Sequence, residues 1–105
     1  MRDSDDAGWR VRARRELEAE TGYRAGRLQP LGSFFGSSGI SNERFHLFLA
    51  DALTADGVMQ REATEQIEIE LRPLDDLCRM ALAGEIEDAP SALALLLARD
   101  AIGKR

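Results

Sequence analysis

The run from residue 10 to residue 21 most constrains the fold, because it is charged, uninterrupted and followed at once by a glycine. It contains good helix formers and neither proline nor glycine, which predicts an α-helix over about residues 10–22. Gly22 stands where a residue in the left-handed conformation would end that helix. An apolar stripe would seat the helix on a core, and its members are Trp9, Ala13 and Leu17.

Two carboxylates of this helix share one face, since Glu16 and Glu20 are four residues apart. Such a pair can share a magnesium ion, which prefers oxygen ligands and keeps several waters. Magnesium neutralises a bridging diphosphate and lowers the pKa of a bound water, which makes a nucleophile near neutral pH. The alternative for a helix rich in arginine and glutamate is a solvated face held by ion pairs between residues four apart.

Residues 15–23 read R-E-L-E-A-E-T-G-Y and resemble the second half of a Nudix box. The family pattern there is R-E-U-x-E-E-x-G-U, where U is a bulky apolar residue. The matching residues are Arg15, Glu16, Leu17, Glu20, Gly22 and Tyr23. Ala19 departs from the pattern, because the family usually has a glutamate at that position. Counting back places Ala7 and Met1 at the upstream glutamate and glycine, so we expect the first half of the box to be missing.

The order of segments after the helix resembles the ADP-ribose and nucleoside-diphosphate-sugar pyrophosphatase branch of the Nudix family. A strand-like run, a loop of small residues and an apolar strand come first, and an acidic loop and a closing helix follow. These segments are residues 24–35, 36–44, 45–50, 65–69 and 84–98, so the resemblance covers about residues 12–100. ADP-ribose enzymes of the branch usually have a proline near the position of Ser38. ADP-ribose is therefore a preference among nucleoside-diphosphate sugars.

The resemblance implies a set of site residues. Glu16 and Glu20 would bind one or two Mg²⁺ ions, with Mn²⁺ as the alternative, and Glu16 would belong to the catalytic set. Glu65 would be a further metal ligand or the base that takes a proton from the attacking water, with Glu62 as its alternative. Glu43 and Ser38 would contact the substrate. The alternative for Glu43 is a surface turn, and the alternative for the loop that contains Ser38 is an ordinary hairpin connection.

Two further residues receive structural roles. Arg15 is interpreted as a tether that holds the box helix by ion pairing. His46, the single histidine, alternates with core-facing positions and is interpreted as structural.

Composition limits the class of protein. A length of 105 residues predicts one domain with a modest core, and a formal net charge of −5 argues against nucleic acid as a partner. No apolar run is long enough to span a bilayer and no signal-peptide pattern is present, which argues against a membrane partner. The single Cys78 excludes an intramolecular disulfide and suits the reducing cytoplasm.

Patterning predicts the order helix, strand, strand, strand, helix, helix. The third strand rests on the alternation of Ile67, Ile69 and Leu71 with polar residues. The last two helices are expected over about residues 74–83 and 90–101, with Asp88 or Ser91 as the cap of the second. Between them and the second strand, we expect a polar loop around residues 55–57.

We therefore expect an α/β fold, a partial Nudix-type helix-sheet-helix sandwich with a mixed sheet, in a single truncated domain over residues 1–105. The first strands of a complete Nudix domain lie upstream of the box. Because their absence would leave sheet edges unpaired, we expect a homodimer.

The function that the resemblance implies is hydrolysis of the diphosphate of ADP-ribose, or of a related nucleoside-diphosphate sugar, by Mg²⁺-activated water. The first alternative is a catalytically degenerate Nudix-like module for dimerisation or partner binding, which Ala19 favours. The second alternative is the C-terminal fragment of a longer Nudix enzyme.

Overall fold

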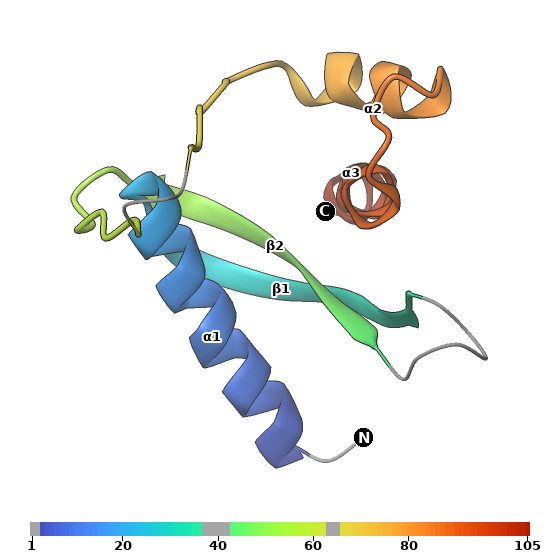
Figure 1. Cartoon of the computed structure of the whole chain (residues 1–105). Coiled ribbons are helices and arrows are strands. Elements are labelled where there is room, and N and C mark those ends of the chain that lie inside the picture. Colours follow the sequence, from blue (N-terminus) through green and yellow to red (C-terminus); the bar gives the residue numbers. More distant parts are fainter. Residues whose placement is uncertain (1–2, 37–42, 63–65) are drawn as a thin grey trace. The chain divides into compact units, whose positions relative to one another are not determined.

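A computed structural model describes residues 3–36, 43–62 and 66–105 of the chain. The elements are α1 (Asp3–Thr21), β1 (Arg24–Phe35), β2 (Arg44–Thr54), α2 (Leu74–Leu82) and α3 (Ala89–Gly103) (Figure 1). Contacts divide the chain into two compact units. We name them the α1 unit (Met1–Gln29 and Ala50–Glu70) and the α2–α3 unit (Pro30–Leu49 and Leu71–Arg105).

Helix α1 begins at Asp3, earlier than the predicted residue 10. Residues 3–9 contain no proline, and a glycine such as Gly8 costs a helix only about 1 kcal/mol relative to alanine, so the helix continues toward the N-terminus. At the other end, Gly22 has φ +75° and its N–H bonds to the carbonyl of Glu18 at 2.8 Å. The prediction that Gly22 ends the helix in the left-handed conformation is confirmed.

Strands β1 and β2 form a two-stranded sheet. The Gly36 N–H donates to the carbonyl of Glu43, and Ser33 Oγ lies 2.8 Å from His46 Nδ1. Nearer the other end of the strands, Arg27 pairs with Asp51. The residue number falls along β2 as it rises along β1, so the strands are antiparallel. The half-buried His46 and its contact with Ser33 fit the structural role predicted for this residue.

The predicted third strand is not formed, because residues 66–73 have no regular secondary structure. A strand needs a neighbour to exchange backbone hydrogen bonds, and no described segment supplies one here. Ile69 and Leu71 are 42% and 81% exposed, so their alternation with polar residues does not correspond to a buried face. The described residues thus give an α/β structure with a two-stranded sheet in place of the expected three-stranded mixed sheet.

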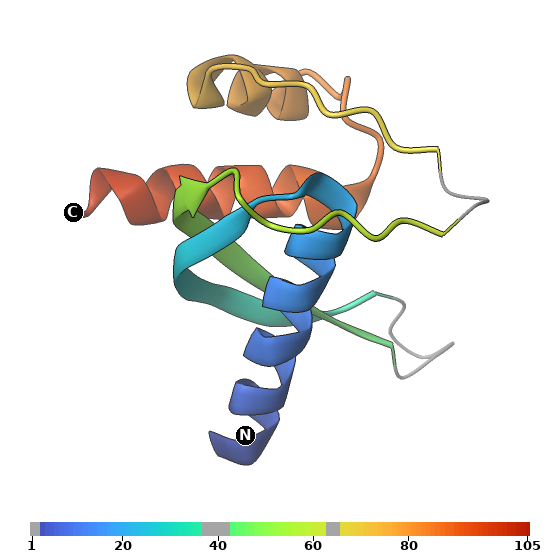
Figure 2. The same ribbon diagram turned by 90° about the vertical axis from the view of Figure 1, so that its left-hand side faces the viewer.

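The α2–α3 unit contains two adjacent helices, which Figure 2 shows one beside the other. Pro73 precedes α2, and Gly84 follows it with φ +78°. Helix α3 is capped by Asp88, whose side chain accepts a hydrogen bond from the N–H of Ser91 at 3.0 Å. Asp88 is therefore the cap, and Ser91 is its partner.

Burial in this unit centres on Cys78, which is 1% exposed, and Ala98, which is 8% exposed. The Cys78 thiol lies 3.4 Å from the carbonyl of Leu95, so α2 and α3 meet at these small residues. Within the described ranges, no helix has both the length and the apolar character that a bilayer span requires.

Candidate functional site

The C-terminal end of α1 is covered by residues 57–61. The last carbonyls of a helix have no partner inside the helix, so another group must satisfy them. Here the Gln60 N–H donates to the carbonyl of Ala19 at 2.8 Å, and Arg61 Nε donates to that of Glu20 at 2.9 Å. The N–H of Gly57 donates to the carbonyl of Gly22 at 2.9 Å. A segment about forty residues away in sequence therefore caps the helix that carries the box.

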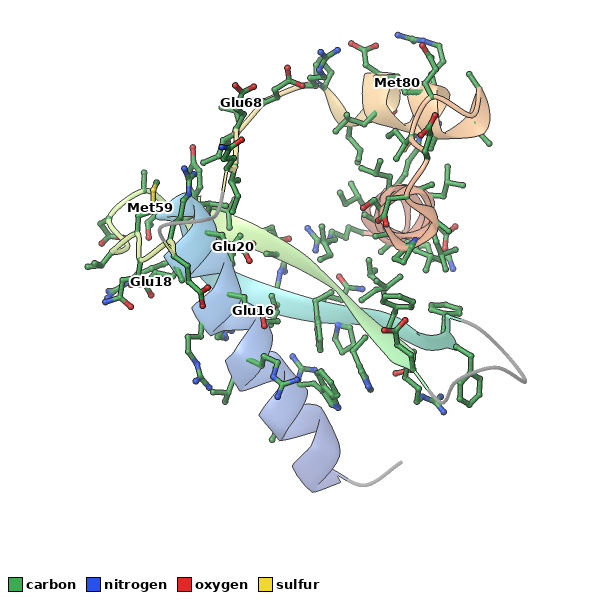
Figure 3. The ribbon with its side chains drawn as sticks, in the orientation of Figure 1. Glu16, Glu18, Glu20, Met59, Glu68 and Met80 are labelled. Atoms are coloured by element: carbon green, nitrogen blue, oxygen red, sulfur yellow. The ribbon has the colours of Figure 1, made fainter. Side chains whose placement is uncertain are left out.

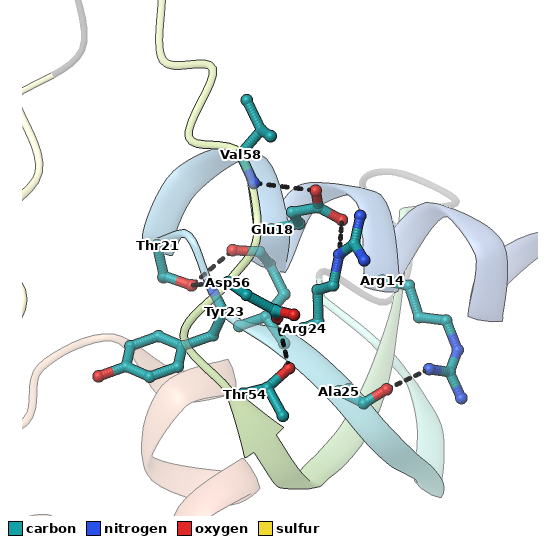
Figure 4. Close-up of polar contacts among 10 residues, drawn as sticks. Arg14, Glu18, Thr21, Tyr23, Arg24, Ala25, Thr54, Asp56 and Val58 are labelled. Atoms are coloured by element: carbon teal, nitrogen blue, oxygen red, sulfur yellow. Dashed lines mark hydrogen bonds and ion pairs between the residues drawn. The ribbon is translucent and has the colours of Figure 1, made fainter.

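Glu18 completes this arrangement from the helix side (Figure 4). Its carboxylate accepts a hydrogen bond from the Val58 N–H at 3.0 Å and lies 3.5 Å from Arg24 Nε. The side chain of Glu18 is 29% exposed, and that of Arg24 is 57% exposed. The loop and the start of β1 are thus both joined to the last turn of α1 through one carboxylate.

Two arginines fix α1 along β1. Arg10 Nη1 donates to the carbonyl of Leu28 at 2.6 Å, and Arg14 Nη1 donates to that of Ala25 at the same distance. The predicted tether was Arg15, but Arg15 is exposed and forms no ion pair with another described residue. The prediction failed because it assumed an ion pair with an acidic side chain. The guanidinium groups that hold the helix bond to backbone carbonyls instead.

The two predicted metal ligands, Glu16 and Glu20, are both exposed on α1. Figure 3 labels them and shows Glu18 on the other side of the helix. Glu16 and Glu20 are one turn apart, whereas Glu18 is rotated from Glu16 by about 200° around the helix. The pair therefore projects away from the contacts that Glu18 makes. Both carboxylates are exposed to solvent.

This pair fits the manner in which Mg²⁺ is often bound, by one or two carboxylates together with substrate phosphates and water. It is not a complete protein site. Over residues 3–36, 43–62 and 66–105, no three or more histidine, cysteine, aspartate or glutamate side chains form a group that could hold a metal ion. Substrate oxygens and water would add to these two ligands.

A hollow of about 280 Å³ lies beside this end of α1. Its lining residues are Arg15, Glu18, Ala19, Val58 and Gln60. The methyl group of Ala19 thus lines the hollow where the resemblance led us to expect a carboxylate. The hollow can admit a group from outside the chain, but the side chain of Ala19 has no atom that could coordinate a metal ion.

The other predicted site residues are not all brought to this place. Glu65 and Ser38 lie outside the described residues. Glu62, the alternative to Glu65, is exposed and follows Arg61, which is bonded to α1. Glu43 belongs to the α2–α3 unit, where its carbonyl accepts the Gly36 N–H at 3.0 Å.

Sequence reasoning missed Glu18 and the part of the chain that contacts it. Glu18 occupies an unspecified position of the box pattern, and residues 55–57 were predicted only as a polar loop. The one available signal was Gly57, because glycine permits close approach of two backbones. A methyl group at position 57 would lie 2.7 Å from Glu18 Cγ and 2.8 Å from the Gly22 carbonyl oxygen.

The loop also contains a perturbed carboxyl group. Thr54 Oγ1 donates to Asp56 Oδ1 at 2.7 Å (Figure 4). That bond, followed by a hydrogen bond from the backbone, lowers the pKa of Asp56 below its ordinary value. Hydrogen bonds to the ionised form therefore favour a charged Asp56 immediately before Gly57.

Comparison with known proteins gives three relatives of similar identity. The ADP-ribose pyrophosphatase of Bacillus subtilis is 34% identical over 84 residues, covering 79% of this chain and 45% of that protein. The methanol dehydrogenase activator of Bacillus methanolicus is 34% identical over 90 residues, covering 82% and 47%. The CMP-5'-(N-acetyl-N-hydroxy-3-aminopropyl)phosphonate hydrolase of Streptomyces rubellomurinus is 33% identical over 86 residues, covering 82% and 41%. The chain spans less than half the length of each of these relatives.

A family model described as NUDIX domain matches residues 5–95. The match runs from residue 5 in α1 through both strands and α2 to residue 95 in α3, and it includes Glu16 and Glu20. Because it covers most of the sequence, the chain belongs to the Nudix family.

Proposed function

We propose that the chain contributes to Nudix-type hydrolysis of the diphosphate in ADP-ribose or a related nucleoside-diphosphate sugar. The observation that carries this proposal is the pair Glu16 and Glu20, exposed one turn apart on a helix whose last turn is held by residues 57–61. The relative named ADP-ribose pyrophosphatase, 34% identical, supports this choice of substrate class.

The residues would divide the work as follows. Glu16 and Glu20 would hold Mg²⁺, or Mn²⁺, which supplies charge neutralisation at the diphosphate and acidifies bound water. Glu65 would take the proton of the attacking water, with Glu62 as the alternative because it follows the anchored Arg61. Glu43 and Ser38 would contact the substrate. We place this activity in the cytoplasm, where the buried Cys78 thiol would stay reduced.

Variants of the pair test the proposal. Release of AMP from ADP-ribose at millimolar Mg²⁺ would be compared among the wild type, Glu16→Gln, Glu20→Gln and the control Glu85→Gln. Loss of a group that merely supports a metal ligand costs about 10–100-fold in affinity or activity, so loss of a ligand itself should cost at least about tenfold. Glu85 is exposed in the α2–α3 unit, and its variant should match the wild type. Equal rates in all four proteins would contradict the proposed roles.

We propose self-association as the state in which the predicted mixed sheet forms. The exposed Ile69 and Leu71 support this, because exposed apolar side chains favour contact with another chain. Light scattering at micromolar concentration should give the mass of a dimer, and Leu71→Asp should reduce it. A monomer mass for the wild type would contradict this part of the proposal.

A second candidate function is a partner-binding module without turnover. Ala19 favours it, because two carboxylates hold Mg²⁺ less firmly than three. One relative of similar identity is named an activator of methanol dehydrogenase, which shows that names in this group extend beyond hydrolysis. A folded sample that releases no AMP at any Mg²⁺ concentration would favour this candidate.

A further inference from the structure

We propose that Glu18 is a positioning residue that keeps Glu20 in register with Glu16. Glu18 itself would touch neither the metal ion nor the substrate. Its role would be to fix the last turn of α1, on which Glu20 lies, against residues 57–61. This role rests on the proposed function, because it assumes that Glu16 and Glu20 hold the metal ion.

The last turn of α1 is the part of the helix that needs holding. Glu20 is the penultimate residue, since α1 ends at Thr21. Helix ends fray, and a frayed turn would let the Glu20 carboxylate leave its place one turn beyond Glu16. Two ligands that move independently bind an ion more weakly, because ordering them on binding costs conformational entropy.

The contacts of residues 57–61 oppose this fraying from both directions. The loop donates hydrogen bonds to the carbonyls of Ala19, Glu20 and Gly22. In the reverse direction, the Glu18 side chain accepts a hydrogen bond from the N–H of Val58. Since the helix and the loop each satisfy backbone groups of the other, loss of Glu18 would leave the Val58 N–H without its acceptor and loosen the loop.

The side chain of Glu18 points away from the carboxylate pair, which distinguishes a positioning role from metal binding. Its carboxylate is engaged by Val58 and by Arg24 at 3.5 Å, on the side of the helix away from Glu16 and Glu20. A carboxylate compensated in this way is a poor competitor for a cation. Glu18 can therefore hold the turn without withdrawing an ion from the pair.

Gly57 supplies an independent route to the same contact. A methyl group at position 57 would meet Glu18 Cγ at 2.7 Å and the carbonyl oxygen of Gly22 at 2.8 Å. Because the second of these atoms belongs to the backbone, the loop would have to move away from α1. Gly57→Ala should therefore reproduce the effect of Glu18→Ala without removing any carboxylate.

Mn²⁺ serves as the probe in the test. Its binding near Glu16 and Glu20 would be followed by paramagnetic broadening of their backbone amide signals in NMR spectra. Glu18→Ala and Gly57→Ala should each raise the Mn²⁺ midpoint roughly tenfold, as loss of a supporting contact does at metal sites. Glu18→Gln keeps an acceptor for Val58 and loses only the exposed ion pair, so its shift should be about fivefold or less. Glu85→Gln should leave the midpoint unchanged.

The outcomes separate the two proposals. Broadening in the wild type together with the predicted order of midpoints, but without release of AMP, would sink hydrolysis and leave the positioning role standing. An unchanged midpoint in Glu18→Ala, with faster hydrogen exchange at the Val58 amide, would overturn the positioning role whatever the turnover. If Glu18→Ala does not fold, Gly57→Ala makes the same comparison, with Glu18→Gln as its control.

Discussion

Each of the two compact units is stabilised internally by a different kind of contact. In the α1 unit, guanidinium groups and a carboxylate bond to backbone atoms, and Leu28, which is 6% exposed, is the one buried hydrophobic residue among those described. In the α2–α3 unit, two helices pack around Cys78 and Ala98. The stability of the second unit should depend on side-chain volume, whereas the geometry of the first should depend on single polar contacts and on one glycine.

The largest effect should come from a charge placed in the α2–α3 core. Cys78→Asp buries a carboxylate at a position that is 1% exposed, and an uncompensated buried charge costs about 3–5 kcal/mol of unfolding free energy. Leu82→Asp on the same helix is the control, because Leu82 is 73% exposed and exposed substitutions change stability by about 0.5 kcal/mol at most. Urea denaturation would measure both, and similar losses would contradict the apolar core.

The next largest effect is expected at Gly57, where the loop lies close to Glu18 and Gly22. Gly57→Ala should destabilise the α1 unit by about 1–3 kcal/mol, the usual cost of overpacking. Gly8→Ala is the matched control, since a side chain at position 8 would meet no atom within 4 Å and alanine is the better helix former. That variant should stabilise α1 by up to about 1 kcal/mol. Thermal unfolding of both proteins would check the opposite signs, and a neutral Gly57→Ala would show that the loop is not held against the helix.

A smaller loss of unfolding free energy is expected when a contact between α1 and β1 is removed. Arg10→Met retains much of the side-chain volume but removes the donor to the Leu28 carbonyl. Loss of a hydrogen bond that involves a charged group should cost about 1.5 kcal/mol. Arg15→Met, on the same helix, should stay within about 0.5 kcal/mol, and denaturant unfolding of the two variants side by side would test the difference.

The smallest effect concerns pH. The pKa of Asp56 is lowered by the hydroxyl of Thr54, so the contact stabilises the folded state above the ordinary carboxyl pKa. That stabilisation is lost as the pH falls through the lowered value. An NMR titration of the Asp56 carboxyl should give a midpoint below the ordinary value, and Thr54→Ala should raise it. A midpoint that Thr54→Ala leaves unchanged would contradict the assigned cause.

The same difference explains what the sequence could predict. Local signals mark several helix ends: Gly22 follows α1, Pro73 and Gly84 flank α2, and Asp88, one of the two caps predicted, begins α3. Such residues can be predicted because they act on their own neighbours. The third strand failed, because alternation over residues 66–72 states a preference but supplies no neighbouring strand.

In the candidate site, too, features set by local spacing could be predicted, whereas contacts between residues distant in sequence could not. Glu16 and Glu20 were predicted to share a face from their spacing alone, and both are exposed on α1. The bond from Val58 to Glu18 joins residues 40 apart, and no periodic pattern encodes it. Arg15 was assigned a tether that Arg10 and Arg14 provide instead, because a bond to a backbone carbonyl is independent of the partner's side chain.

The proposed role of the carboxylate pair on α1 is diphosphate hydrolysis. A Mg²⁺ titration of AMP release from ADP-ribose by the wild-type chain, with folding verified by circular dichroism, tests this role. Release should rise with Mg²⁺, saturate and stop when the ion is chelated. A folded protein that releases no AMP at any Mg²⁺ concentration, or releases it equally in the presence of chelator, would contradict this role.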